Sequence, residues 1–363
     1  MKSLCIEVSS GIFEKLSLDD LIKDGSSLIE FLSFLDVGDI EEHVQANYYE
    51  RKPQHNVGAM LRLSVVYYFY GDRGYGRIIE SLTEHELRLL KLKKPPSPSA
   101  LHHFIHYRIG ESGFVKIMEL IAQKLDNLAE KNGIKHLSHD STPIEASRYD
   151  KNADYNPHYQ CMMYKAHITM KGTIPLLMTF SSGSAGDSPY LEPHLYKLKE
   201  LGINCDFMDL DTAYDSFENH ARVKHVIGAY PYIGLKENAV ANDDGKVEAI
   251  NHWCSKLWKE GGNPNATLKS KLDFLFEQGR IEQVGAYYRN KNLAGMPKEK
   301  TDLRAAQERI HSHIKGTVKF DVRNRQNSKK SLHVLAAFVS YQLLVLAALQ
   351  NGLNPNEFGF IRM

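Results

Sequence analysis

TDLRAAQERIHSHIK, residues 301–315, predicts an amphipathic helix on which the other candidate residues of the chain depend. Thr301 is a good N-cap residue and Gly316 a good C-cap residue, so about four helical turns fit between them. Four apolar residues recur at helical spacing and predict a buried stripe: Leu303, Ala306, Ile310 and Ile314. Four polar residues form a second stripe beside it: Arg304, Glu308, His311 and Lys315. Glu308 is therefore expected at the edge of a core, either as a solvated partner of Arg304 or as a functional carboxylate.

The composition limits the classes of protein to consider. A chain of 363 residues predicts two or three structural units rather than one core. Its 45 Lys and Arg against 44 Asp and Glu give a net charge of +1, so a nucleic-acid site requires local clustering of basic residues. The four scattered cysteines disfavour zinc and disulfides and fit a reducing cytoplasm. We read no signal peptide at the N-terminus, and the apolar run 332–349, interrupted by polar residues, predicts a buried helix rather than a membrane span.

Residues 1–132 have a helical pattern throughout. We expect one helix to start at Ser17, another to be capped by Thr83 and a third by Ser99. A basic turn lies between the second and the third, with Lys91, Lys93 and Lys94. Such a domain can be a helix-turn-helix-type reader of DNA or a helical packing domain with solvated lysines.

Residues 133–235 change to the pattern of a mixed sheet: three strands, helix, strand, helix, strand. The first strand carries Asp140 at its end and is closed by Pro143, and the fourth carries Asp211 at its end. With the Glu308 helix, this order predicts an α/β ribonuclease-H-like core with helices on its faces, completed by residues 301–363. Residues 236–300 predict an inserted subdomain with a strand at 283–289, because structureless loops of this length are uncommon.

Three motifs resemble the cut-and-paste DDE transposases of prokaryotic insertion sequences. Arg304, Glu308 and Lys315 have the Arg-x3-Glu-x6-Lys spacing found around the catalytic glutamate of that family. Thr301 stands where the family has a Tyr that contacts a DNA phosphate. Asp140-Ser-Thr resembles the family's first-strand motif, and Asp211-Thr-Ala-Tyr-Asp resembles its Asp-x-x-Tyr-Asp motif. The helical N-terminal part is also similar to the family's, whose members often carry a β-rich insertion before the glutamate helix.

This resemblance implies a catalytic triad that binds metal ions. Asp140, Asp211 and Glu308 would hold two Mg²⁺ ions, or Mn²⁺ in their place, with Asp140 bridging both ions. Two ions about 4 Å apart activate the attacking oxygen and neutralise charge on the leaving group. Asp209 shares a strand face with Asp211 and is its rival for the second position. Each of these acids, taken alone, can also be an ordinary strand-end carboxylate in water.

The resemblance also implies contacts with DNA. Arg304 and Lys315 are expected to bind phosphates of the bound end. The basic run after the helix predicts a track along the DNA backbone, or a solvated face: Lys319, Arg323, Arg325, Lys329 and Lys330. Weaker candidates for the same role are Lys165, Lys236 and Arg289. Trp258, and after it Trp253, could receive a flipped base, whereas the simpler interpretation makes both the core of the insertion.

The expected function is therefore that of a DDE transposase acting in the cytoplasm, at the nucleoid. It would bind the terminal inverted repeats of its element in double-stranded DNA as a homodimer, cleave at the ends and join the 3′-OH to target DNA. The alternatives are a ribonuclease-H-like DNA nuclease without strand transfer and a catalytically silent DNA-binding protein, although the complete triad argues against the silent protein. His102 and His106 share a helical face, but with no cysteine beside them they are weak zinc ligands.

Overall fold

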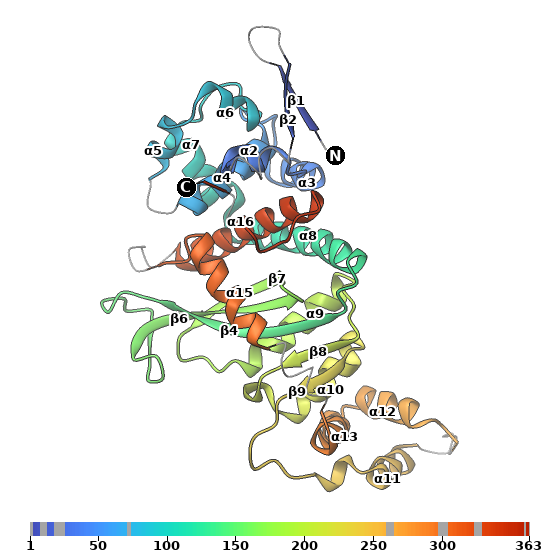
Figure 1. The fold of residues 1–363 in the computed structure, drawn as a ribbon. Helices are drawn as coiled ribbons and strands as arrows, with labels where there is room; N and C mark the ends of the chain where they lie inside the picture. The colour runs from blue at the N-terminus through green and yellow to red at the C-terminus, as the bar shows by residue number, and fades with distance from the viewer. Residues whose placement is uncertain are drawn as a thin grey trace.

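The computed structural model describes residues 3–7, 13–17, 26–70, 74–258, 265–296, 304–322, 329–358 and 361–362, and the side chains of 27 onward in these ranges except at 304–306 and 362. Figure 1 shows a stack of N-terminal helices, then a layer of long helices, then a sheet, with further helices beyond the far edge of the sheet. The described helices of the N-terminal part are α2 Leu28–Ser33, α3 Gly38–Tyr48, α4 Val57–Tyr70, α5 Tyr75–Glu80, α6 Glu84–Leu89, α7 Pro98–His103, the π-helix η1 Phe104–Ile109 and α8 Gly110–Lys131.

The N-terminal part differs from the all-helical expectation at its start. Strands β1 (Ser3–Glu7) and β2 (Phe13–Ser17) form an antiparallel hairpin in which Ser17 pairs with Ser3. Ser17 therefore ends a strand, and the helix predicted to start there would lie in 18–25, outside the described residues. The first described helix, α2, is capped by Ser27 in a capping box with Glu30. The short strand β3 (Ser26–Ser27) pairs in parallel with β10 (Ile361–Arg362).

Two predicted helix caps have different outcomes. The capping box of α6 is confirmed, because Glu86 N–H donates to Thr83 Oγ1 at 3.2 Å and Thr83 N–H donates to Glu86 Oε2 at 2.8 Å. Ser97, rather than the predicted Ser99, caps α7, and its hydroxyl accepts from Ala100 N–H at 3.1 Å. Pro98 then occupies the first helical position, where its missing N–H costs nothing.

The sheet is mixed, as predicted, and has the strand order β5-β6-β4-β8-β9, with β7 paired to β6. β4 runs antiparallel to β6, which forms an antiparallel hairpin with β7, whereas β4, β8 and β9 are parallel. The strands are β4 His136–Glu145, β5 Asp154–Asn156, β6 Cys161–Lys171, β7 Ile174–Ser182, β8 Phe207–Leu210 and β9 Tyr230–Ile233. The helices between them are η2 Ser188–Tyr190, α9 Leu191–Glu200, η3 Thr212–Tyr214 and α10 Phe217–Ile227.

β4 extends further than the sequence indicated. Pro143 was expected to close this strand, but β4 continues to Glu145. Beyond His139 the strand is paired only with β6, since the pairing with β8 ends there. A residue without an N–H is tolerated where a strand has a free side, which explains Pro143 within β4.

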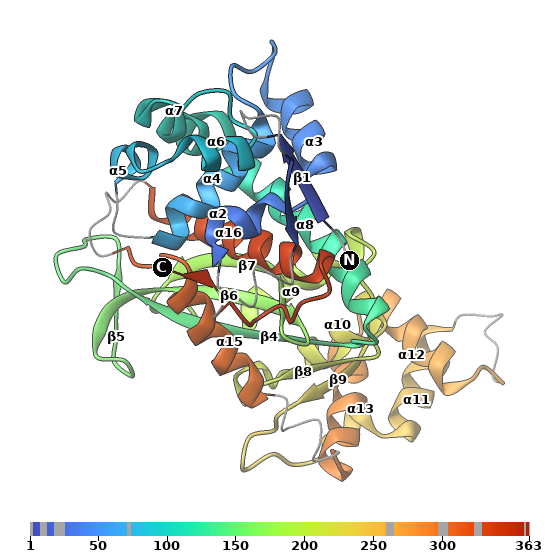
Figure 2. The same ribbon diagram turned by 45° about the horizontal axis from the view of Figure 1, so that its top comes forward.

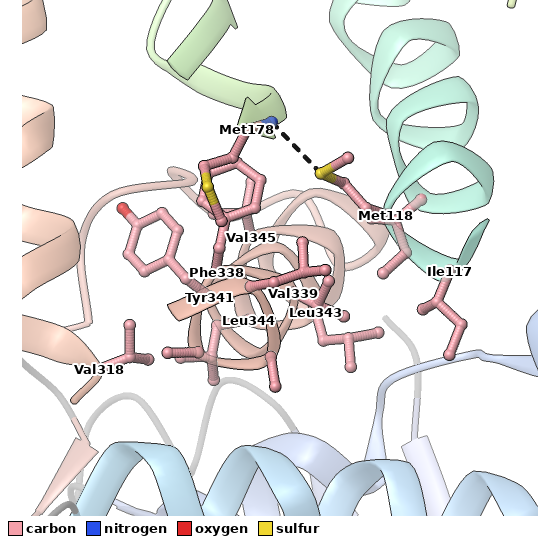
Figure 3. Close-up of a cluster of buried hydrophobic side chains, with 14 of the residues drawn as sticks. Ile117, Met118, Met178, Val318, Phe338, Val339, Tyr341, Leu343, Leu344 and Val345 are labelled. Atoms are coloured by element: carbon pink, nitrogen blue, oxygen red, sulfur yellow. Dashed lines mark hydrogen bonds between the residues drawn. The ribbon is translucent and has the colours of Figure 1, made fainter. Parts of the chain in front are cut away.

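Helix α16 (Lys330–Gln350) forms the centre of the molecule. Figures 1 and 2 show it beside α8, between the sheet and the N-terminal helices. It is the one helix in the described ranges that is long and apolar enough to cross a membrane, and 94% of its most apolar window is buried inside the protein. Figure 3 shows Phe338, Tyr341 and Leu344 packed in this core, near Met118 of α8 and Met178 of β7. The prediction of a buried helix is confirmed, and its apolar residues lie on all sides because all sides are covered.

The described residues of 236–296 form a helical insertion, and none of them belongs to a strand. It comprises η4 Asp243–Gly245, α11 Val247–Leu257, α12 Leu268–Glu277 and α13 Ile281–Ala294. The predicted strand 283–289 lies inside α13, where Val284, Tyr287 and Tyr288 are buried at helical spacing. The insertion has its own hydrophobic cluster, with Ile250, Cys254, Leu272 and Leu275 as further members.

A close backbone approach joins the insertion to helix α10. A Cβ atom added to Gly285 of α13 would lie 1.8 Å from the carbonyl oxygen of Phe217, at the start of α10. Only glycine allows the two helices to pack this closely without a shift of the backbone.

Gly285→Ala should therefore destabilise the protein by about 1–3 kcal/mol, the usual cost of overpacking a close contact. Thermal unfolding followed by circular dichroism measures this change. Gly316→Ala in α15 (Arg304–Thr317) is the matched control, because nothing lies within 4 Å of its added Cβ. Equal melting temperatures for Gly285→Ala and wild type would contradict the close packing of α13 on α10.

Candidate active site

Asp140 and Asp211 lie at matching positions of two adjacent strands. β4 and β8 pair in parallel, and the last pair of their register is His139 with Leu210. Asp140 and Asp211 are the next residues along the two strands. Because partners in a parallel register project on the same face of a sheet, the two carboxylates are expected side by side.

Each of these carboxylates is oriented by the residue that follows it. Asp140 Oδ1 accepts a hydrogen bond from Ser141 N–H at 2.8 Å, and 29% of the Asp140 side chain is exposed. Asp211 caps η3, and its Oδ1 accepts from the N–H of Thr212 and, at 2.9 Å, from the Thr212 hydroxyl. Both acids are thus held by local bonds while remaining partly accessible to solvent.

Helix α15, which carries Glu308, packs against β4. Ile310 and Ile314 are buried, which confirms that part of the predicted stripe, whereas Glu308 is exposed on the helix edge. His311, less than one turn beyond Glu308, is buried, and its Nδ1 lies 4.0 Å from Asp140 Oδ2. Thr301 and Leu303 lie outside the described residues, as do the side chains of Arg304 and Ala306.

The charges of the predicted acids affect the pKa of two tyrosines. The pKa of Tyr214 is raised by burial and further by three negative charges: Asp140, Asp187 and Asp211. The pKa of Tyr159 is raised by burial and then by an overlapping set: Asp140, Asp187 and Glu308. The charges of the three predicted acids therefore raise the pKa of one or both of these tyrosines.

Asp187 is a fourth carboxylate in this region that sequence reasoning missed. It lies between β7 and η2, where it accepts from Lys165 Nζ at 2.9 Å and lies 3.8 Å from His167 Nδ1. Lys165 also donates to the carbonyl of Ala185 at 2.9 Å, so this weaker DNA-contact candidate is engaged inside the protein. The polar run 181–188 after an apolar strand was the sequence signal for this position.

A buried layer of histidines lies beneath Asp140. His139 Nδ1 is 2.8 Å from Thr169 Oγ1, which is 2.7 Å from His194 Nδ1, and His194 Nε2 is 3.1 Å from Thr179 Oγ1. Burial lowers the pKa of His194 to about 3 and that of His139 well below its usual value. These rings are therefore neutral at ordinary pH, and their hydrogen bonds fix the strand that carries Asp140.

The donor chemistry of the three acids fits a hard divalent cation, because carboxylate oxygens are the ligands that Mg²⁺ prefers. In the described part of the chain, however, no three His, Cys, Asp or Glu side chains lie close enough together to hold one ion. Binding would therefore require the side chains of Asp140, Asp211 and Glu308 to move toward one another. The same finding gives no support for zinc at His102 and His106.

Asp209 and Asp211 differ sharply in exposure. Asp209 is only 1% exposed and lies inside the sheet between Ser138 of β4 and Tyr232 of β9. Asp211 follows the end of β8 and is partly exposed. This difference favours Asp211 as the acid that a substrate can reach.

The predicted DNA contacts are found in several places. Lys315 Nζ lies 3.4 Å from the Pro143 carbonyl and lines a cavity of about 320 Å³ beside β4. Lys236 is exposed just beyond β9. Lys319 donates its backbone N–H to Tyr68 of α4 at 2.8 Å, which ties the segment after α15 to the N-terminal domain. Arg323 and Arg325 lie outside the described residues.

The two lysines at the end of the predicted basic track make contacts within the protein. Lys330 is 3% exposed and forms an ion pair with Asp150, so it is not a surface cation. Lys329 Nζ lies 4.7 Å from the ring centroid of Tyr107, in a cation–π contact. The track can therefore include Lys330 only if this ion pair breaks.

Both tryptophans pack in the insertion. The Trp258 ring lies 5.6 Å from that of Phe274, and Arg280 lies 4.5 Å from the ring centroid of Trp253. Both are partly buried against the hydrophobic cluster of the insertion. These contacts are those expected of a core role, and contact with a base remains a prediction.

The Asp-x-x-Tyr-Asp stretch has a second role, which the sequence did not indicate. Asp215 is fully buried and accepts two hydrogen bonds from Arg289 of α13, at 2.8 and 3.1 Å, while His220 Nε2 lies 3.3 Å away. Burial opposes ionisation of Asp215, but the contacts with His220 and Arg289 outweigh it and hold its pKa well below the usual range. Arg289, a weaker candidate for DNA binding, instead attaches the insertion to the site.

Comparisons with known proteins identify a family over more than half of the chain. A family model described as "Transposase DDE domain" matches residues 131–341, which contain all three acids. A solved piggyBac transposase synaptic complex with hairpin DNA aligns with 91% of this chain and 77% of its own, at 9% identity and a TM-score of 0.36. A score this low supports no statement about the fold. No curated protein matches the chain.

Arg289→Ala should weaken the docking of the insertion by about 3 kcal/mol, because it leaves the Asp215 carboxylate buried without its cation. Urea unfolding followed by tryptophan fluorescence measures this, since both tryptophans of the chain lie in the insertion. The full difference in unfolding free energy between wild type and Arg289→Ala should be present above about pH 4. It should shrink as the pH falls further, because a carboxyl whose pKa is lowered in the folded state stabilises that state only when it is ionised. Lys246→Ala, which removes an exposed ion pair with Asp243, should leave the transition unchanged. Identical transitions for Arg289→Ala and Lys246→Ala would contradict this role.

Proposed function

The chain belongs to the transposase DDE domain family, and we propose that it cuts DNA at the ends of a mobile element and joins the freed 3′-OH to target DNA. The observation that carries this proposal is the register of β4 and β8, whose last pair, His139 with Leu210, directly precedes Asp140 and Asp211. Helix α15 adds Glu308 from a separate element, packed against β4. A hairpin followed by parallel strands, with helices on the sheet, supports a ribonuclease-H-like core.

The three acids would hold Mg²⁺, or Mn²⁺ in its place. When bound, these ions supply an activated oxygen nucleophile and neutralise the charge that develops on the leaving oxygen. The hydrogen bonds from Ser141 and Thr212 orient two of the carboxylates. Lys315, in its cavity beside β4, would bind a phosphate of the end and place the scissile bond at the acids.

DNA would extend from the acids over basic residues of several elements. We propose that Lys315, Lys319 and Lys236 contact its phosphates, together with Arg304 and Arg323. Because the net charge of the chain is only +1, these local contacts rather than a general field must attract DNA. We further propose that the protein works as a homodimer in the cytoplasm, at the nucleoid, on the inverted repeats of a prokaryotic insertion sequence. Inverted repeats that flank the reading frame would support this origin.

The N-terminal domain contains a second basic site, which would recognise the ends. A cavity of about 450 Å³ lies between the chain after α3 and the turn after α6. Four lysines and a histidine line it: Lys52, His55, Lys91, Lys93 and Lys94. The pKa of His55 is lowered by burial and by the charge of Lys94, so the two side chains are close. Gln45, Gln54 and Asn56 add hydrogen-bonding groups, and Glu41 is the one acid in the lining. Such a cleft fits a DNA phosphate backbone.

The first test of this function removes the acids one at a time. Asp140→Asn, Asp211→Asn and Glu308→Gln should each lower nicking and joining by several orders of magnitude, because each removes a charged ligand at nearly constant shape. Binding of an end-containing duplex in a gel shift should be unchanged or tighter. The assay is joining of a pre-cleaved end to a plasmid in Mg²⁺.

The outcomes of this test separate the alternatives. A wild-type protein that nicks but never joins is a nuclease, and one that binds without metal-dependent nicking is a silent binding protein. Asp209→Asn is the internal control, since Asp209 is buried. Loss of activity in Asp209→Asn but not in Asp211→Asn would overturn the choice of the second carboxylate.

The second test concerns the N-terminal cleft. Lys93→Ala and Lys94→Ala should weaken binding of an end-containing duplex and reduce the slope of log affinity against log salt by about 0.9 for each phosphate that the variant no longer neutralises. Lys131→Ala, an exposed lysine that does not line the cleft, should leave the slope unaltered. The measurement is gel-shift affinity over a series of salt concentrations. Equal slopes for all three variants and wild type would show that the cleft does not hold DNA.

A further inference from the structure

The segment 146–160, between β4 and β6, presents three exposed tyrosines. Tyr149 is 75% exposed, Tyr155 is 55% exposed and Tyr159 is 48% exposed. Figures 1 and 2 show this segment, with β5, projecting from the edge of the sheet opposite the insertion helices. Large aromatic rings are usually covered in a folded protein, so a group of exposed ones calls for a partner.

Hydrogen bonds hold the turn that carries Tyr159 in a defined shape. Asn156 Oδ1 accepts from the N–H groups of His158 and Tyr159, at 3.0 and 3.3 Å. Gln160 has φ of +52°, in the left-handed region, immediately after Tyr159. The Tyr159 ring also packs edge-on against the ring of His158, with centroids 4.8 Å apart. Because this turn is already ordered, a ligand that binds the ring does not have to order it.

The same turn is attached to the loop that carries Asp187. Asn156 Nδ2 donates to the carbonyl of Gly183 at 2.9 Å, and Ser184 Oγ donates to Asp154 Oδ2 at 2.5 Å. Further along the same loop, the Ala185 carbonyl and the Asp187 carboxylate both accept hydrogen bonds from Lys165 Nζ. Tyr159 therefore lies at the rim of the candidate active site. The effect of Asp140, Asp187 and Glu308 on its pKa, which follows that of burial, agrees with this position.

The chemistry of this rim favours a base over a phosphate. The surrounding carboxylates repel phosphates that are not paired with metal ions, whereas a neutral ring offers a face to a planar base. Further out, the Arg148 guanidinium lies 4.7 Å from the ring centroid of Tyr149 and adds a cationic stacking surface. Stacking of bases on aromatic rings does not depend on their identity, so such a surface would act at any target sequence.

We propose that Tyr159 stacks on an unpaired base of the DNA strand next to the scissile phosphate, and that Tyr155 and Tyr149 extend this surface along the strand. This inference rests on the proposed function, since it requires DNA at the acids. It gives the unpaired base a receptor on the β5 side of the sheet, separate from the tryptophans of the insertion.

The test uses the full chain and a forked duplex whose first unpaired base beside the end is 2-aminopurine. Wild type and Tyr159→Phe should quench its fluorescence on binding, because both keep an aromatic face. Tyr159→Leu, of similar size but without that face, should lose the quenching and bind the fork about fivefold or more weakly, with a smaller change for a blunt duplex. Because the Tyr159 side chain is half exposed, the melting temperature of the Tyr159→Leu variant should match that of wild type.

Each other outcome has a definite meaning. Unchanged quenching in Tyr159→Leu overturns the proposal, and loss of quenching in Trp258→Leu alone assigns the base to the insertion. A change in dimerisation by light scattering, with unaltered quenching, would make this face a contact between copies of the chain. If wild type quenches the probe but joins no ends, the transposase proposal fails while the stacking site stands. If wild type binds no DNA, both fail.

Discussion

The parallel pairing of β4 with β8 is the constraint on which the candidate site depends. Two acids that are far apart in the chain, Asp140 and Asp211, both follow the last pair of this register, His139 with Leu210. Parallel strands cannot be joined by a tight turn, so the chain must cross over between them, and the β6–β7 hairpin and α9 occupy that crossover. A shift of one residue in this register would move one carboxylate to the opposite face of the sheet.

The sequence alone was sufficient where a pattern is local. The apolar periodicity of α15, the capping box at Thr83 and the acids beside β4 and β8 all come from spacings within one element. Prediction from the sequence failed where packing against other elements determines the secondary structure. Residues 283–289 alternate loosely like a strand, yet burial of Val284, Tyr287 and Tyr288 against other helices makes them helical. Pro143 was predicted to end its strand, because the sequence does not show that β4 is paired only with β6 at this point. A strand can contain proline where one of its sides is unpaired.

The predicted site shows the same division. Asp140, Asp211 and Glu308 stand in recognisable motifs, whereas Asp187 lies only in a polar run, and its contacts with Lys165 and His167 appear only in the structure. Basic residues were the least predictable group. Lys165, Lys330 and Arg289 look like surface cations in the sequence, but each forms an ion pair with an acid remote in the chain. Whether a lysine or arginine can meet a phosphate depends on such partners, which spacing does not indicate.

The central position of α16 has a consequence for the synthesis of the chain. This helix separates the sheet from the N-terminal helices and contacts α4, α8 and β7, all of which precede it. While α16 is still inside the ribosome, the surfaces that it covers have no partner, and the two halves of the molecule cannot close on each other. A growing chain would therefore expose apolar surface until translation has passed α16. We expect such a nascent chain to need chaperones, and an unfinished chain to be cleared by proteases rather than to persist as a folded fragment.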